Sequence, residues 1–164
     1  MSTKKKPYQA KPFESTKPTK NTSANIFTTM MTSEAWKHLT GNQKALYLHM
    51  KERMYGQPNK TRPDPNNLAA FTFPKRVWCN LFGLYSSNNQ SGFERDRDAL
   101  IEHGFIICIE IGKNTRKENI YEYSDRWQYW TEEHGLDIPP EHMSASMLNK
   151  LANKANRTAK INDR

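Results

Sequence analysis

The sequence predicts a mixed α+β domain whose centre lies between Phe71 and Ile111. Two observations support this prediction. Apolar and polar residues in this stretch follow the order of a short strand, a helix, a polar turn, a second helix and a strand. A polar turn and a return strand at Ile120–Tyr123 come next. This is the element order of a winged helix-turn-helix domain, with a three-helix core and a β-hairpin wing.

Charge is unevenly distributed along the 164 residues, whose formal net charge is +8. Residues 1–22 carry +5 and residues 149–164 carry +4, whereas the segment between them carries −1. Such an excess favours polyanionic partners. The N-terminal lysines suit either a solubilising leader or an arm that follows phosphates, and few apolar residues accompany them. We therefore expect a disordered basic arm (1–24), a winged-helix domain (25–130), and a linker with a basic C-terminal helix or tail (131–164).

Capping residues predict two helices before the central stretch. Thr32 or Ser33 can cap a short helix that ends at Leu39. Thr40 and Gln43 then have the spacing of a capping box, in which each side chain bonds the backbone N–H of the other residue. A new helix should therefore begin directly after the threonine.

This longer helix is predicted from Gly41 to about Tyr55. Apolar residues recur along it at a spacing of four and form a stripe that should face the core. Lys51 is expected to lie outside the stripe. The stripe consists of Leu46, Met50 and Met54, widened by Tyr47 and Leu48.

A strand over Leu68–Phe73 and a helix to Phe82 open the central stretch. Pro74 suits the first helical position, where no backbone N–H is needed. Lys75 and Arg76 fall on the polar side of the helix, where they can contact solvent or a phosphate. The apolar face is expected to contain Val77, Trp78, Leu81 and Phe82.

The polar turn over residues 83–92 is rich in helix-capping residues. The third helix of the expected three-helix core, after the first, which ends at about Tyr55, and the second, which ends at Phe82, begins within this turn and ends at Gly104. One buried turn of that helix should hold Asp96 or Arg97 in place of an apolar residue. Either the helix is half buried there, or these residues pair with neighbours. The bare sequence E-R-D-R-D is otherwise typical of a solvated charged face.

Phe105–Ile111 alternates as a strand with one apolar face, and the return strand follows a turn with three cations. Because this hairpin directly follows two helices, we expect its tip to contact phosphates or the minor groove. Trp127 and Trp130 are expected to pack on the domain rather than stack on bases. A polar linker (131–140) and a helix (140–160) should follow. That helix docks on the domain, pairs with a second copy, or orders only on DNA.

Catalytic chemistry finds little support. The five histidines lack metal-ligand spacing, and no phosphate-cradling glycine loop or activated nucleophile is recognisable. Isolated histidines and carboxylates are therefore interpreted as surface residues, and Cys79 and Cys108 as small buried hydrophobes. We expect no enzyme, no cofactor and no metal. The absence of a long apolar run and of a signal peptide predicts a cytoplasmic protein without membrane contact.

Several short patterns carry a family resemblance that spans roughly residues 28–130. They are Ser33-Glu34-Ala35-Trp36-Lys37-His38-Leu39, Ala45-Leu46-Tyr47, Met50-Lys51-x-Arg53, Phe71-x-Phe73, Phe93-x-Arg95, Leu100-x-x-x-Gly104-Phe105-Ile106 and Ser124-x-x-Trp127. The chain resembles small winged helix-turn-helix DNA-binding proteins of bacterial phages, plasmids and conjugative elements. The resemblance implies binding to double-stranded DNA in transfer-origin processing, replication or transcriptional control. It also implies relaxase, replication or transfer proteins as partners, and a monomer or homodimer.

The DNA-binding candidates fall into three groups. Amides and arginine match the base edges of the major groove, which singles out the N-terminal end of the third helix. Lysines and arginines of the second helix and the wing suit phosphates. The alternative is a winged-helix module that assembles a replication or transfer complex through protein contacts, which the near-neutral centre of the chain allows. The candidates are Asn88, Asn89, Gln90, Ser91 and Arg95 for bases, Lys75 and Arg76 for phosphates, and Lys113, Asn114, Arg116 and Lys117 in the wing.

Overall fold

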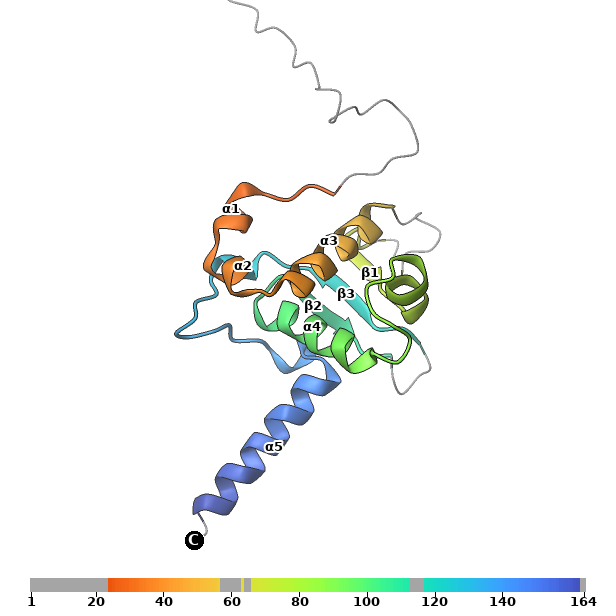
Figure 1. Ribbon diagram of the computed structural model, residues 1–164. Coiled ribbons are helices and arrows are strands. Elements are labelled where there is room, and N and C mark those ends of the chain that lie inside the picture. Colours follow the sequence, from red (N-terminus) through yellow and green to blue (C-terminus); the bar gives the residue numbers. More distant parts are fainter. Residues whose placement is uncertain (1–23, 57–62, 64–65, 113–116, 163–164) are drawn as a thin grey trace, which may run out of the picture.

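The computed structural model describes residues 24–56, 63, 66–112 and 117–162. Short helices and a small sheet form the body of the described chain, and α5 projects from it (Figure 1). The elements in chain order are α1 (Thr28–Thr32), α2 (Glu34–His38), α3 (Gly41–Gly56), β1 (Ala70–Thr72), the π-helix η3 (Arg76–Leu81), α4 (Gln90–Glu102), β2 (Ile106–Glu110), β3 (Ile120–Tyr123), the 3₁₀ turns η5 (Arg126–Gln128) and η6 (Pro140–His142), and α5 (Ala145–Asn162).

The three strands form one antiparallel sheet in the order β1-β3-β2. Tyr121 of β3 lies in its centre, opposite Phe71 on one side and Cys108 on the other. The pairing of β2 shifts between Cys108 and Glu110, which is the irregularity of a β-bulge. The predicted α+β class is confirmed. The element order α3-β1-η3-α4-β2-β3 with this strand order is compatible with a winged-helix-like fold.

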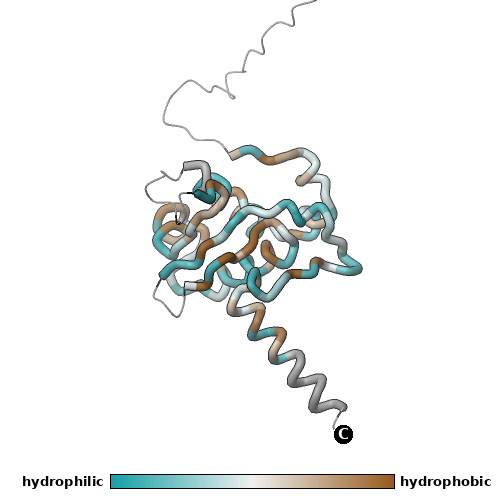
Figure 2. Tube along the Cα trace, turned by 180° about the vertical axis from the view of Figure 1, so that it is seen from behind, coloured by the Kyte–Doolittle hydropathy of each residue, from teal (hydrophilic) through white to brown (hydrophobic). Residues whose placement is uncertain are grey.

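Helices α3 and α4 pack on each other and on the sheet, and their shared interior is the core. Aromatic rings fill much of it: Tyr47 of α3 lies edge-on to Phe105, at 5.2 Å between ring centroids. Trp130 is 7% exposed and Trp127 is half-buried against the same core, so the predicted packing of both tryptophans is confirmed. In Figure 2 apolar positions recur along the strands and again in the first turns of α5.

The predicted caps are confirmed in detail. Ser33 caps α2, since its hydroxyl accepts a hydrogen bond from the backbone N–H of Trp36 at 3.2 Å. Thr40 N–H donates to Gln43 Oε1 at 2.8 Å, and Gln43 N–H donates to Thr40 Oγ1 at 3.4 Å. This is a complete capping box, and α3 begins at Gly41 as expected.

The buried stripe of α3 differs from the predicted one. Leu46, Tyr47 and Met50 are buried as expected, but Leu48 is 41% exposed and Lys51 is only 6% exposed. The cause is the segment before α1, which crosses this part of the helix: Lys51 Nζ donates to the carbonyl of Asn25 at 2.6 Å. The side chain of Met54 lies outside the described residues.

The helix after β1 is a π-helix rather than an α-helix. Phe82 N–H donates to the carbonyl of Val77, five residues back, at 3.0 Å. Val77 therefore aligns with Phe82 and not with Leu81, which turns outward and is 64% exposed. The expectation that Leu81 belongs to the apolar face was wrong for this reason.

The end of α4 matches its prediction. Gly104 has a φ of +77°, Phe105 N–H donates to the Leu100 carbonyl at 2.9 Å, and Gly104 N–H donates to the Ile101 carbonyl at 3.0 Å. This is a Schellman cap.

Beyond Trp130 the chain remains packed on the domain. Ile138 is 6% exposed and η6 lies against β2, although the sequence predicts a polar linker. The C-terminal helix begins at Ala145, five residues after its predicted start, because Ser144 caps it: the Ser144 hydroxyl accepts from Met147 N–H at 3.2 Å.

Candidate nucleic-acid interface

A groove of about 880 Å³ lies between the start of η3, the start of α4, the base of the β2–β3 hairpin and the first turns of α5. We call it the basic groove. It brings together four residues that the sequence predicts as DNA contacts, although they come from three separate elements. These residues are Lys75, Arg76, Gln90 and Lys117.

Cations outnumber carboxylates among the described residues that line the basic groove. The carboxylates are Glu94 and Glu118. Glu94 accepts a hydrogen bond from the Gln90 amide at 3.0 Å. Two of the cations have carboxylate partners outside the lining, since Arg97 pairs with Asp98 and Lys150 with Glu102. A concave surface with this balance attracts a polyanion. The five cationic residues of the lining are Lys75, Arg76, Arg97, Lys117 and Lys150.

A set of polar contacts, buried between α4 and α5, runs beneath the basic groove and links three of its walls. The Asn119 amide, at the hairpin base, donates to the Tyr121 hydroxyl at 3.1 Å, and Arg97 of α4 interacts electrostatically with the Tyr121 side chain. Arg97 donates twice to Asp98 Oδ1, from Nε at 3.0 Å and from a terminal nitrogen at 2.7 Å. The Ser144 hydroxyl, at the start of α5, donates to the same Oδ1 at 2.7 Å.

The charged run of α4 is therefore not the solvated face that its sequence suggests. Asp96, Arg97 and Asp98 are 1%, 6% and 1% exposed. The alternative, that Asp96 and Arg97 pair with neighbours, is what the structure has. These side chains are covered because α4 packs against α3 and the sheet. Ser144, at the start of α5, also lies against Asp98 and donates a hydrogen bond to it. The interpretation of isolated carboxylates as surface residues was wrong here.

Asp96 links the polar turn before α4 to helices α3 and α4 through hydrogen bonds. Its carboxylate accepts from the Tyr85 hydroxyl at 2.9 Å, from Arg95 Nε at 3.1 Å and from the Gln43 amide at 3.4 Å. Burial, followed by the bond to Asp96, raises the pKa of Tyr85, so its hydroxyl stays protonated and keeps donating. The turn before α4 is held in one position by this contact.

The other predicted contacts do not line the basic groove. Asn88, Ser91 and Arg95 are exposed elsewhere at the start of α4, and the Arg95 side chain is 68% exposed beside Asp96. Asn89 is the N-cap of α4, where its amide oxygen accepts from Gly92 N–H at 3.1 Å. Part of its hydrogen-bonding capacity is therefore already used. Lys113, Asn114 and Arg116 lie outside the described residues.

Sequence reasoning missed the contribution of α5 to the groove. Asn149, Lys150 and Asn153 line it beside Arg97. Asn149 and Asn153 are four residues apart in the sequence, a spacing that places both amides on one face of a helix. The sequence does not reveal that this face turns towards α4, because that depends on the bond between Asp98 and Ser144.

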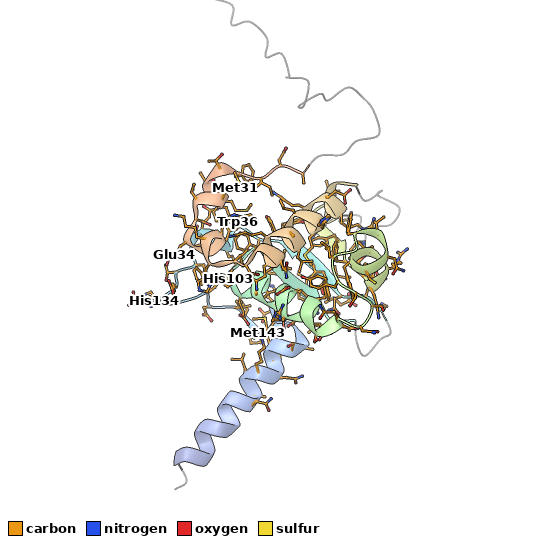
Figure 3. All side chains as sticks on the ribbon, in the orientation of Figure 1. Met31, Glu34, Trp36, His103, His134 and Met143 are labelled. Atoms are coloured by element: carbon orange, nitrogen blue, oxygen red, sulfur yellow. The ribbon has the colours of Figure 1, made fainter. Side chains whose placement is uncertain are left out.

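A second cavity, of about 820 Å³, shares no described lining residue with the basic groove. It lies among α1, α2, α3 and η5, and Tyr47, Lys51, Trp127 and Trp130 are in its walls. Figure 3 shows Glu34 and His134 at this edge of the domain, and Glu34 Oε1 accepts from the backbone N–H of Glu132 at 2.9 Å.

Two histidines, His38 and His103, are in contact at the C-terminal end of α4. His103 Nδ1 donates to the Ala99 carbonyl at 2.7 Å, so its Nε2 accepts from His38 Nδ1 at 2.8 Å. Trp130 stacks on His103 at 4.4 Å between centroids. Burial lowers the pKa of His103. This histidine is 8% exposed, and its assignment to the surface was wrong because sequence distance hides the partner at His38.

Among the described residues, no group of three or more His, Cys, Asp or Glu side chains is placed to hold a metal ion. None of the helices in that part of the chain has the length and apolar character of a membrane span.

The chain was compared with known proteins at three levels. No protein-family model, curated protein or solved structure matches it.

Proposed function

We propose that this chain is a non-enzymatic, winged-helix DNA-binding protein of a mobile genetic element. The start of α4 reads bases in the major groove, and the lysines and arginines of η3, the wing and the chain ends contact phosphates. Its role lies in transfer-origin processing, replication or transcriptional control. The observation that carries the proposal is the meeting of Lys75, Arg76, Gln90 and Lys117 in one basic groove.

The pattern of exposed residues along α4 supports contact between DNA and the N-terminal end of this helix. Gln90, Ser91 and Arg95 are exposed, whereas most of the helix after them is buried. A duplex that meets this end encounters an amide, a hydroxyl and a guanidinium, which are groups suited to base edges and phosphates.

The floor of the basic groove favours a duplex over a single strand. Phe73, Trp78 and Phe93 line it but are 3%, 2% and 6% exposed. Single-stranded nucleic acid is commonly held by bases that stack on open aromatic faces. These rings are already stacked on one another, with Trp78 and Phe93 at 4.9 Å between centroids. Contact is therefore left to the polar rim.

The proposal is tested with duplexes selected by the full chain from a random library. Binding of a labelled selected duplex is followed by fluorescence anisotropy at several salt concentrations, with and without competitor DNA. Lys117→Ala should reduce the slope of log affinity against log salt by about 0.9, the value of one phosphate contact. Arg95→Ala should weaken the preferred sequence by about 1–3 kcal/mol and random DNA less. Lys37→Ala, an exposed lysine of α2 outside the groove, is the matched control.

Absence of any sequence preference that survives competitor DNA would contradict the proposal. An affinity that does not change with salt would contradict it as well, because phosphate contacts release counterions.

A second candidate function is a protein-interaction module that assembles a replication or transfer complex. The observation that favours it is a set of exposed apolar residues on the segments that form the second cavity. Phe27, Met31 and Tyr129 are 64%, 45% and 76% exposed. Exposed apolar clusters often mark protein contacts. Tyr129→Ser with Phe27→Ser should abolish such assembly and leave DNA affinity unchanged, whereas loss of DNA affinity would argue against this assignment.

A further inference from the structure

We propose that α5 is a second DNA-reading helix, which contacts bases through Asn149 and Asn153. Its direction is set by the buried hydrogen bond between Asp98 and Ser144. This inference rests on the proposed function and extends the interface from α4 and the wing to the C-terminal helix.

The start of α5 is fixed to α4. Ser144 is 1% exposed, donates to Asp98 and caps the new helix through Met147 N–H. Met147 is 7% exposed, and Lys150 Nζ lies 3.7 Å from Glu102 Oε1 at the end of α4. Two turns of α5 are thus attached to the domain, and the remainder projects from it (Figure 1).

The attachment turns an amide-bearing face towards the basic groove. Asn149 and Asn153 are exposed, and within the described part of the chain no hydrogen bond involves either amide. Asparagine is a weak helix former, so two such residues on an exposed face do not serve helix stability. An asparagine amide both donates and accepts, which matches the N6 and N7 groups of adenine.

The charge of α5 identifies a nucleic acid as its partner. Residues 145–162 contain Lys150, Lys154, Arg157 and Lys160 and no acidic residue. Two copies of a helix with this composition repel each other, whereas a phosphate backbone attracts it. With 18 residues, α5 is about 27 Å long, which corresponds to about 8 base pairs of duplex. It therefore reaches DNA beyond the part that the start of α4 can touch.

The opposite face of α5 supplies a matched control. Leu148 and Leu151 are 38% and 48% exposed and do not line the basic groove. If α5 paired with a second copy, this apolar face would be the one to be covered. The two faces of one helix thus separate the two possibilities.

The experiment uses the full chain and duplexes selected by it from a random library. Asn149→Ala with Asn153→Ala should bind the selected duplex at least tenfold more weakly and random duplex DNA unchanged, and should reselect a shorter preferred sequence. Ser144→Ala should keep the positions set by α4 and lose preference at the outer ones. Leu148→Ser with Leu151→Ser should reselect the full sequence with unchanged affinity. The mass of the particle in solution, which reports the oligomeric state, should also be unchanged.

An unchanged preferred sequence and affinity in the double asparagine variant would overturn this inference. A fall in both molecular mass and DNA affinity in the double leucine variant would also overturn it, because a second copy would then cover α5. In either case Arg95→Ala and Lys117→Ala still report separately on the proposed function. If the unaltered chain binds no duplex in a salt-dependent way, the proposed function fails, and this inference fails with it.

Discussion

Asp98 and Ser144 lie 46 positions apart in the chain and share a buried hydrogen bond of 2.7 Å. The acceptor, Asp98 Oδ1, also receives both donors of Arg97. One oxygen atom thus joins α4 to α5 and neutralises a guanidinium that is 6% exposed. A buried charge of this kind is tolerated only while its partner is present.

Removal of that partner should be costly. Asp98→Ala leaves Arg97 buried and unpaired, and we expect the free energy of unfolding to fall by about 3–5 kcal/mol. Ser144→Ala removes a helix cap and one hydrogen bond, for a loss of about 1–2 kcal/mol. Urea denaturation measures both values. Ser146 lies two residues after Ser144, in the first turn of α5, and is half-buried, so Ser146→Ala should change stability little. Equal losses in the two serine variants would contradict this assignment.

Two glycines with similar backbone angles should respond differently to alanine. Gly104 has a φ of +77°, and a Cβ there would lie 2.7 Å from the backbone of Arg126 and Trp127. Gly135 has a φ of +64° and open space around it. We expect Gly135→Ala to cost about 1–2 kcal/mol of left-handed strain. Gly104→Ala adds a backbone collision and should cost clearly more in thermal denaturation. Similar losses would show that the surrounding backbone yields easily.

The stability of the domain should decline as the solution becomes acidic. Burial lowers the pKa of His103 below its ordinary value of 6.5. When the pH falls below 6.5, His103 is protonated in the unfolded chain but stays neutral in the folded chain. The free energy of unfolding therefore falls with falling pH. His103→Gln should flatten this dependence, measured as the urea midpoint between about pH 7.5 and pH 5.5. His134→Gln, whose side chain is 77% exposed, should leave the profile unchanged.

The two cysteines should differ in reactivity. Burial raises the pKa of Cys108 to about 11, and its side chain is fully covered. Because the thiolate is the reactive form, iodoacetamide at neutral pH should leave Cys108 unmodified in the folded chain. Cys79 is half-buried and should take up the label first. Peptide mass spectrometry before and after addition of urea measures both residues. Equal labelling rates for Cys108 in the two conditions would show that the core opens readily.

The features predicted correctly from the sequence are local ones. The caps at Ser33 and Thr40 depend on residues three positions away, and Gly104 ends its helix through bonds within the preceding turn. The predicted hairpin is also present, since β2 and β3, which are consecutive along the chain, pair with each other.

The features that were missed depend on distant partners. The charges of Asp96 and Asp98 indicate a solvated helix face until Tyr85 and Ser144 are placed against them. Lys51 is polar in any local window, yet the backbone of Asn25 covers it. The four groove residues predicted from the sequence came from recognising a fold pattern, whereas Asn149 and Asn153 required the orientation of α5.

The π-helix between Val77 and Phe82 holds one residue more than an α-helical turn would need. Leu81 is the residue displaced outward, and it is 64% exposed. A one-residue insertion into an α-helix would produce a turn of this form. A homologous chain that lacks this residue should still place the counterparts of Val77 and Phe82 together. Sequence comparison across this helix should therefore allow a one-residue gap.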